Sequence, residues 1–389
     1  MRLRHTLLLA AFALALAPAG ARAQDSIKIG FLAPFSGPFA DFGEQMQHGV
    51  DLYIQLHGDS VAGHKIEILK RDANGIDPAA SKREAQELVT RDHVSFMTGF
   101  GLTPDAMAVA PVGTEGKVPM IIMNAATGTI LEKSPYFVRF SFTLAQIVTP
   151  LGKWAAQNGM KRVYVAVSDY APGYEAENAF TKAFTAAGGT VVGSVHIPLQ
   201  NPEFAPYVQR IKDAKPQAVF LFLPTGQQPT GFVRQFIQLG LKKAGVKLLG
   251  GSEIIDDTAL KTLGDDALGV ISTQVYSYAH PGAANAAYVK AWKSAYGSEH
   301  RPDFMSVAAY DSMAAIYAVV KQLNGTIDPD KAMAAFKSLK FESPRGPIEI
   351  DPDTREMIES VYIRRVERVN GELVNKEILE FPRTKDPGR

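Results

Sequence analysis

The chain of 389 residues contains no cysteine. Disulfides, thiol nucleophiles, thiolate-bound metals and lipid attachment through a processed cysteine are therefore excluded. The eight histidines include no pair at i and i+4 with a glutamate between them, so the spacing typical of a metal site is missing too. A Gly-x-Ser-x-Gly elbow, a Walker loop and a complete dinucleotide fingerprint are also lacking. We expect no metal, no cofactor and no enzymatic activity.

Neither a membrane-spanning run nor an excess of positive charge is found after the first residues. Residues 1–23 have the pattern of a secretory signal peptide, with Arg2 and Arg4 before the apolar run 7–17 and Ala21-Arg-Ala23 before the cleavage point. Its removal takes away three of the 41 basic residues and leaves 38 against 40 acidic ones. That balance has no electrostatic footprint for nucleic acid. We expect an exported protein located in the periplasm.

The mature chain alternates short apolar runs with amphipathic stretches of helical length. From residue 27 to residue 129 four such strand-and-helix units follow one another, and a second series runs from 147 to 275. Units of this kind predict parallel sheets covered by helices on both faces. The nine or ten expected strands favour two sheets over one. Three helical stretches follow, and Asn370-Gly371 between two apolar runs predicts a closing β-hairpin.

One loop is the first candidate for a ligand site. Pro119 precedes a short apolar run that reads as a buried strand, and the small and polar residues 124–129 follow it. Ligands of open α/β sheets lie at the carboxyl ends of strands, where free N–H groups and hydroxyls can hold an anion. The alternative is an ordinary strand-to-helix turn in which Thr127 or Thr129 caps a helix.

Other predicted strands also end in aromatic and hydroxyl residues. These residues are Phe35, Phe39, Phe42, Phe100, Thr103, Ala125, Thr127, Asp169, Tyr170, Thr225, Ser252, Glu253, Tyr276 and Tyr278. Aromatic walls with few polar groups suit a small amphiphilic ligand. For any single aromatic, the alternative is a loop side chain that covers the core of its own domain. Ser36 is a conceivable nucleophile, but nothing in its local sequence supplies a base, so a hydrogen-bonding role is the better interpretation.

Several of these motifs together resemble the Leu/Ile/Val-binding proteins of ATP-driven uptake systems. The matching segments are 29–38, Phe42-Gly43, Asp72, Asn124-Ala-Ala-Thr127 and Ala309-Tyr-Asp311. The segments 38–43, 169–173 and 304–311 are most similar to the branch that takes up aromatic acids. The resemblance extends over the mature chain. It implies a type I periplasmic binding protein with two doubly wound α/β lobes, three crossovers and an interlobe cleft. Lobe 1 would comprise residues 26–141 and 274–350, and lobe 2 residues 142–273 and 351–389.

The resemblance also implies residue roles. Thr127 would bind a ligand carboxylate, Ala125 would offer its carbonyl to an ammonium group, and Glu253 would pair with that group. Thr103 and Thr225 stand where the family has a serine and a tyrosine, and the family's usual disulfide is missing. Glu253 favours an amino acid, since a buried carboxylate needs a partner. Phe42, Tyr170 and Tyr276 favour a planar aromatic acid. Both ligand classes stay open at this stage.

Capture by hinge closure is the expected mechanism. The expected partners are a small carboxylate and an ABC permease in the inner membrane, with no nucleic acid, and we expect a monomer. One alternative is a sensor that passes the same ligand to a signalling partner. The other is an exported hydrolase that uses Ser36.

Overall fold

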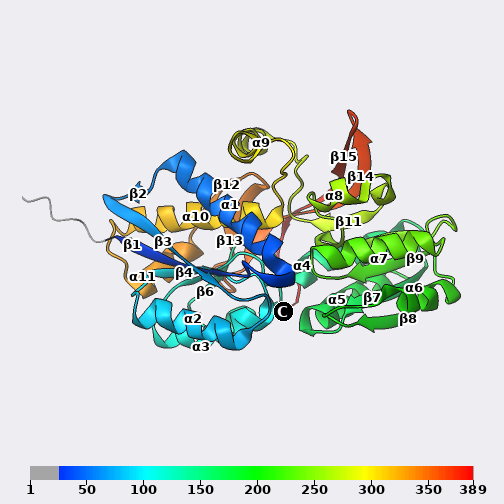
Figure 1. The fold of residues 1–389 in the computed structure, drawn as a ribbon, viewed down its shortest axis with the longest axis horizontal. Coiled ribbons are helices and arrows are strands. Elements are labelled where there is room, and N and C mark those ends of the chain that lie inside the picture. Colours follow the sequence, from blue (N-terminus) through cyan, green and yellow to red (C-terminus); the bar gives the residue numbers. More distant parts are fainter. Residues whose placement is uncertain (1–25, 389) are drawn as a thin grey trace, which may run out of the picture.

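The computed structural model describes residues 26–388, so the predicted signal peptide lies outside the described part of the chain. These residues form two sheets, each with helices packed on it, which lie side by side in Figure 1. We call the part around the six-stranded sheet lobe 1 and the part around the nine-stranded sheet lobe 2. The predicted fold class, two α/β lobes, is confirmed. No described helix is long and apolar enough to cross a membrane.

Lobe 1 is built on a parallel sheet with one short antiparallel edge strand. In spatial order its strands are β2 (Ser60–Val61), β3 (His64–Asp72), β1 (Ile27–Ala33), β4 (Phe96–Gly99), β5 (Met120–Ile122) and β6 (Phe137–Arg139). The associated helices are η1 (Gly37–Phe39), α1 (Ala40–His57), α2 (Pro78–Thr90), α3 (Thr103–Glu115), η2 (Ile130–Lys133), α9 (Ala283–Tyr296), α10 (Phe304–Gln322) and α11 (Pro329–Lys337). Helices α1 and α10 pack closely, because a Cβ atom on Gly49 would lie 2.2 Å from the Ser306 carbonyl oxygen. Glycine is therefore required at this crossing.

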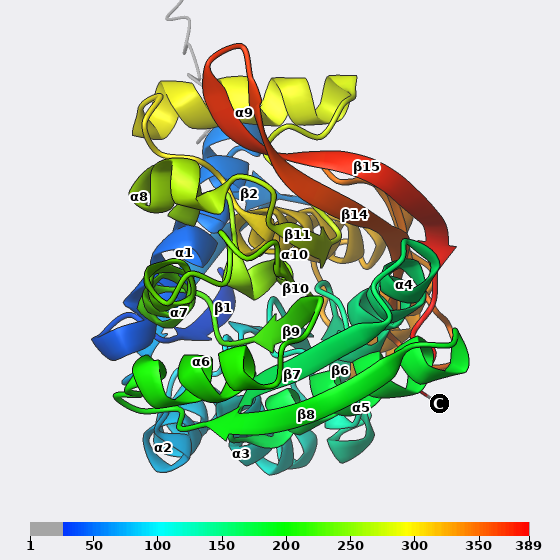
Figure 2. The same ribbon diagram turned by 90° about the vertical axis from the view of Figure 1, so that its right-hand side faces the viewer.

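Lobe 2 has a mixed sheet. Its order is β12 (Lys340–Ser343), β13 (Gly346–Ile350), β14 (Met357–Val369), β11 (Ile271–Gln274), β10 (Lys247–Gly251), β9 (Ala218–Phe222), β7 (Arg162–Ser168) and β8 (Thr190–Ile197), with β15 (Glu372–Thr384) paired to β14. The helices are α4 (Leu144–Gln157), α5 (Ala171–Ala186), α6 (Phe204–Asp213), α7 (Gln227–Gln238), η3 (Ser252–Ile254), α8 (Ala259–Leu263) and η4 (Gly264–Ala267). The predicted hairpin is confirmed, and Figure 2 shows its two long strands curving along one side of the molecule.

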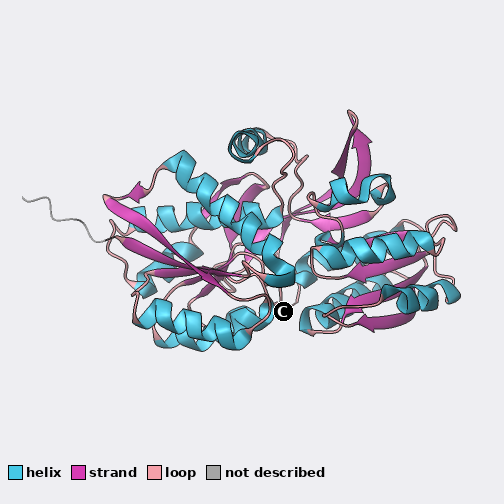
Figure 3. Cartoon of the chain, in the orientation of Figure 1, coloured by secondary structure: helices cyan, strands magenta, loops and turns pink. Residues whose placement is uncertain are grey.

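Three segments join the lobes: β6 to α4, β11 to α9, and α11 to β12. Sequence patterns missed β2, β6, β12 and β13, which are all five residues long or shorter. Strands β12 and β13 fall in the range predicted for lobe 1, yet β13 is hydrogen-bonded to β14 in the sheet of lobe 2. The exact lobe boundaries therefore stay a prediction. Figure 3 shows that loops, rather than helices or strands, form most of the chain between the two lobes.

Candidate functional site

Loops and helix starts near the carboxyl ends of strands from both lobes meet in a deep pocket. It is lined by Phe42, Gly101, Leu102, Thr103, Asn124, Ala125 and Ala126 of lobe 1 and by Tyr170, Pro172, Phe222, Pro224 and Glu253 of lobe 2. Five of the eight predicted ligand-binding residues are thus brought together. The pocket volume is only about 30 Å³, room for about two or three water molecules at about 10–15 Å³ each.

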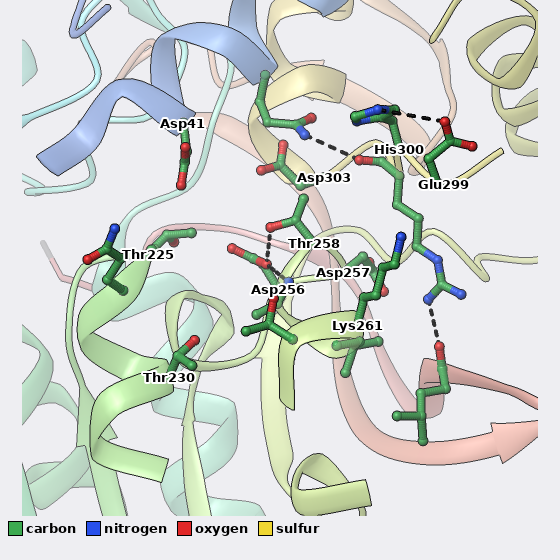
Figure 4. Close-up of a pocket in the computed structure, with 18 of the residues that line it drawn as sticks. Asp41, Thr225, Thr230, Asp256, Asp257, Thr258, Lys261, Glu299, His300 and Asp303 are labelled. Atoms are coloured by element: carbon green, nitrogen blue, oxygen red, sulfur yellow. Dashed lines mark hydrogen bonds and ion pairs between the residues drawn. The ribbon is translucent and has the colours of Figure 1, made fainter. Parts of the chain in front are cut away.

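A wider cleft of about 950 Å³ lies between α1, α7 and α8. Thr225, the sixth predicted residue, lines this cleft rather than the deep pocket. Figure 4 shows Thr225 and Thr230 of lobe 2 facing Asp41 of lobe 1 across the space. The Thr225 hydroxyl is buried and has no hydrogen-bond partner among residues 26–388. A buried polar atom of this kind is suited to receive a ligand group, since leaving it unsatisfied has a cost.

The lobe 1 wall of the deep pocket includes the start of α3. Thr103 is the first residue of α3, so the positive end of this helix and its free N–H groups are close to the pocket. The preceding turn needs a glycine, because Gly99 has a φ of +111° and a Cβ there would lie 2.2 Å from the Leu32 carbonyl oxygen. The Thr103 hydroxyl donates to the Thr127 hydroxyl at 3.2 Å. Thr127 is buried and does not line either space.

Arg139 holds the loop of residues 124–129 through hydrogen bonds to its carbonyl groups. Its buried guanidinium donates to the carbonyl oxygens of Ala125 and Thr127, and to Glu356 at 2.6 Å. The Ala125 carbonyl, which the resemblance assigned to an ammonium group, is therefore already occupied by a cation. Sequence reasoning missed Arg139, although an arginine inside the apolar segment Phe137–Phe140 was a signal that a buried partner exists.

The capping alternative for this loop also finds little support in the geometry. Thr129 occupies the position before η2, but its side chain makes no capping hydrogen bond. The loop is instead held by Arg139 and by bonds to neighbouring loops, such as Ala125 N–H to the Phe100 carbonyl at 2.9 Å. Its conformation thus depends on tertiary contacts.

The lobe 2 wall is aromatic and acidic. Tyr170 stacks on Phe222 with ring centroids 6.4 Å apart, and Glu253 is buried beside them. Burial, and then the charge of Glu253, raise the pKa of the Tyr170 hydroxyl far above its ordinary value. The phenol therefore stays protonated and can donate a hydrogen bond. Phe222 was missed by sequence reasoning because the last residue of a buried strand looks like any core position.

Tyr276 is the second predicted residue, after Thr127, that lines neither space. It is fully buried, and its hydroxyl donates to Asn285 at 3.0 Å. It lines neither the deep pocket nor the wide cleft. The reason is that its side chain points into the interior behind α9, where Asn285 satisfies the hydroxyl.

The hydrolase alternative has weak geometric support. Ser36 is exposed and hydrogen-bonded to Asp72. Hydrogen bonds from Ser36 and from the N–H groups of Phe35 and Asn74 outweigh burial and lower the pKa of Asp72, which makes this carboxylate a poor base. Within residues 26–388, no cluster of three or more potential metal ligands is found.

Comparisons with known proteins identify the family of this chain. A family model of periplasmic binding proteins matches residues 26–372. The Leu/Ile/Val-binding protein homolog 6 of Brucella melitensis is 44% identical over 98% of this chain and 97% of its own length. An ABC transporter solute-binding protein from Rhodopseudomonas palustris BisB5, solved with 3,4-dihydroxybenzoic acid, is 48% identical, with a TM-score of 0.91 over 94% of this chain and 99% of that chain. Another from R. palustris, solved with 4-hydroxybenzoate, is 45% identical over the same shares, again with a TM-score of 0.91. The chain belongs to the periplasmic binding protein family, as a solute-binding protein of the ABC transporter type.

Proposed function

We propose that the protein captures a small aromatic carboxylic acid in the periplasm and delivers it to an ABC permease. The observation that carries this proposal is the deep pocket, which combines an anion-receptive loop on lobe 1 with an aromatic wall on lobe 2. The hydroxybenzoates in the structures of the two R. palustris relatives carry the two groups that such a pocket would receive, a carboxylate and an aromatic ring. A signal peptide would direct the chain to the periplasm.

The two walls suggest one orientation for the ligand. The carboxylate would lie near Thr103, where the N-terminus of α3 favours negative charge. The ring would lie between Phe42 and Tyr170. A ring hydroxyl would then reach Glu253, which can accept a hydrogen bond from it. This orientation needs no ammonium group, in keeping with the engagement of the Ala125 carbonyl by Arg139.

Ligand entry would require the lobes to move. A volume of about 30 Å³ cannot hold an aromatic ring, so the lobes would separate to admit the ligand and close around it. Ligand contacts made from both lobes would favour the closed form, as expected for population shift by differential binding. The closed form would be the one that the permease recognises.

The test is a calorimetric and thermal-shift comparison of 4-hydroxybenzoate, benzoate and tyrosine with the refolded, ligand-free mature protein. At about 100 times its Kd, a ligand stabilises the protein by about 2.7 kcal/mol. We expect 4-hydroxybenzoate to stabilise and tyrosine to have no effect. Stabilisation by tyrosine alone would contradict the proposal and restore the amino-acid alternative.

Replacing Glu253 by glutamine should separate these ligands. Glutamine keeps an acceptor oxygen but loses the charge. A hydrogen bond to a charged group contributes about 1.5–3 kcal/mol and one between neutral groups about 0.5–1.5 kcal/mol, so 4-hydroxybenzoate affinity should fall about fivefold to tenfold. Benzoate has no hydroxyl and should bind Glu253→Gln about as well as the wild type, which makes it the internal control. Equal losses for both ligands in calorimetry would assign Glu253 a structural role.

Replacing Thr103 by valine should weaken every carboxylate ligand. The Thr103 hydroxyl would turn from Thr127 to donate to the ligand carboxylate. Its loss removes a hydrogen bond of about 1.5–3 kcal/mol to a charged group, or at least about tenfold in Kd. Thr98→Val is the matched control, because Thr98 is a buried threonine of the same lobe that donates to the Ile121 carbonyl outside the pocket. If both variants bind ligand like the wild type, Thr103 does not hold the carboxylate.

A further inference from the structure

Direct hydrogen bonds from Glu175 join the lobes beside the deep pocket. Glu175 lies in α5 of lobe 2, and its Oε1 accepts from the backbone N–H of Gly128 in lobe 1 at 2.9 Å. The Thr127 side chain is hydrogen-bonded to the same carboxylate. A carboxylate of the protein is therefore held by the Thr127–Gly128 segment, which the sequence had suggested as a ligand site.

The side chain of Glu175 is partly buried, so its contact with lobe 1 is not one between two exposed surfaces. Burial raises the pKa of its carboxyl group, whereas the Gly128 N–H, the charge of Arg139 and the Thr127 hydroxyl lower it, and Asp386 raises it. The carboxylate has lost part of its hydration, and its partners across the lobe boundary replace that hydration. Separating the lobes here would replace these hydrogen bonds by hydrogen bonds to water.

The contact adjoins residues that line the ligand pocket. Ala125 and Ala126 line it directly, and Gly128 follows two residues later in the same loop. Arg139 holds the carbonyl groups of Ala125 and Thr127 from within lobe 1. Glu175 holds the other side of the loop from lobe 2. The position of the loop therefore depends on both lobes.

We propose that Glu175 is a positioning residue that fastens the ligand loop of lobe 1 to lobe 2 and stabilises the closed arrangement of the lobes. The inference rests on the proposed function in that closure retains the ligand. Glu175 itself lines neither the deep pocket nor the wide cleft, so it acts on the ligand through the loop.

The experiment compares Glu175→Ala, Glu175→Gln and the control Glu177→Ala. Glu177 lies on the same helix but pairs with His196 of lobe 2 at 2.7 Å. The chain has no cysteine, so spin labels can be placed specifically at Lys82→Cys on α2 and Lys212→Cys on α6, both exposed positions. Distances between the labels, measured without ligand by pulsed electron paramagnetic resonance, report lobe separation. Calorimetry with 4-hydroxybenzoate reports affinity.

We expect Glu175→Ala to shift the label distances toward longer values and to raise the Kd about tenfold. Glu175→Gln keeps an acceptor oxygen and should lie between Glu175→Ala and the wild type, while Glu177→Ala should match the wild type. Gly128→Ala should act in the same direction from the other lobe, because its Cβ would lie 3.1 Å from Glu175 Oε1. Its effect should shrink when combined with Glu175→Ala, as for any coupled pair.

Unchanged label distances in Glu175→Ala would overturn the inference, whatever the ligand does. An unchanged Kd in a protein that binds 4-hydroxybenzoate would also overturn it. If the wild type binds no aromatic acid, the proposed function fails instead, and the ligand-free distances still decide whether Glu175 joins the lobes.

Discussion

Arg139→Met should lower the free energy of unfolding by about 3–5 kcal/mol, since removing one partner of a buried ion pair leaves an uncompensated charge. Here that charge is Glu356, which is buried like Arg139 itself. The change also takes the donor away from the carbonyl groups of Ala125 and Thr127. Ligand affinity should therefore fall together with stability, because these carbonyl groups hold the loop beside the deep pocket.

Urea unfolding followed by circular dichroism measures the first effect, and calorimetry with 4-hydroxybenzoate the second. Arg83→Met is the matched control, since Arg83 is exposed on α2 and should change stability by less than about 0.5 kcal/mol. Arg139→Met combined with Glu356→Leu should recover part of the stability by removing the orphaned charge, but it should not recover affinity. A single variant as stable as the wild type would show that the pair contributes little to the fold.

Glu359→Gln should make the protein more stable than the wild type at alkaline pH. Arg345 is buried between two carboxylates, with Asp311 at 2.8 Å and Glu359 at 2.9 Å. Burial raises the pKa of Glu359 from 4.5 to about 8, against the opposing effect of the Arg345 charge, and Asp311 adds to the increase. One guanidinium cannot neutralise two buried carboxylates, so the Glu359 carboxyl group keeps its proton at neutral pH.

The sign of the pH dependence follows from proton binding. Between pH 4.5 and about pH 8, folded Glu359 holds a proton that the unfolded chain has released. The free energy of unfolding of the wild type therefore decreases as the pH rises through this window, by about 1.4 kcal/mol for each unit of pKa difference. Glutamine has no proton to lose, so the variant should lack this contribution.

The measurement is the difference in unfolding free energy between Glu359→Gln and the wild type at pH 5, 7 and 9. Other buried acids, such as Asp105 and Asp256, have pKa values raised to about 7 and about 6 and titrate alike in both proteins. Their contribution cancels in the difference. A difference that stays constant with pH would mean that Glu359 is ionised throughout and fully paired with Arg345.

The repeating units were predictable because each one depends on local patterns. Pro78 at a helix start, alternation of apolar and polar residues, and Asn370-Gly371 at a turn act over a few residues, and α2, β8, α9 and the final hairpin were found where expected. Sequence patterns failed to predict strands that form only because a neighbouring strand pairs with them. Strand β6 has only three residues and exists because it pairs with β5.

Loop positions at the ends of strands were also predictable as a group, since parallel strands end at one edge of a sheet. Phe42, Thr103, Ala125, Tyr170 and Glu253 meet in the deep pocket for this reason. Which way each side chain points was decided by tertiary contacts. Tyr276 turns inward to Asn285, and the Ala125 carbonyl turns toward Arg139.

The sequence alone was enough to establish the family and the fold class, because these depend on residue order and local periodicity. The buried ion pair of Arg139 and Glu356 joins residues 217 positions apart along the chain, and the bond between Gly128 and Glu175 joins residues 47 positions apart. Such contacts exist only once the lobes are folded and placed together, since a buried charge selects its partner by distance in space and not by distance in sequence.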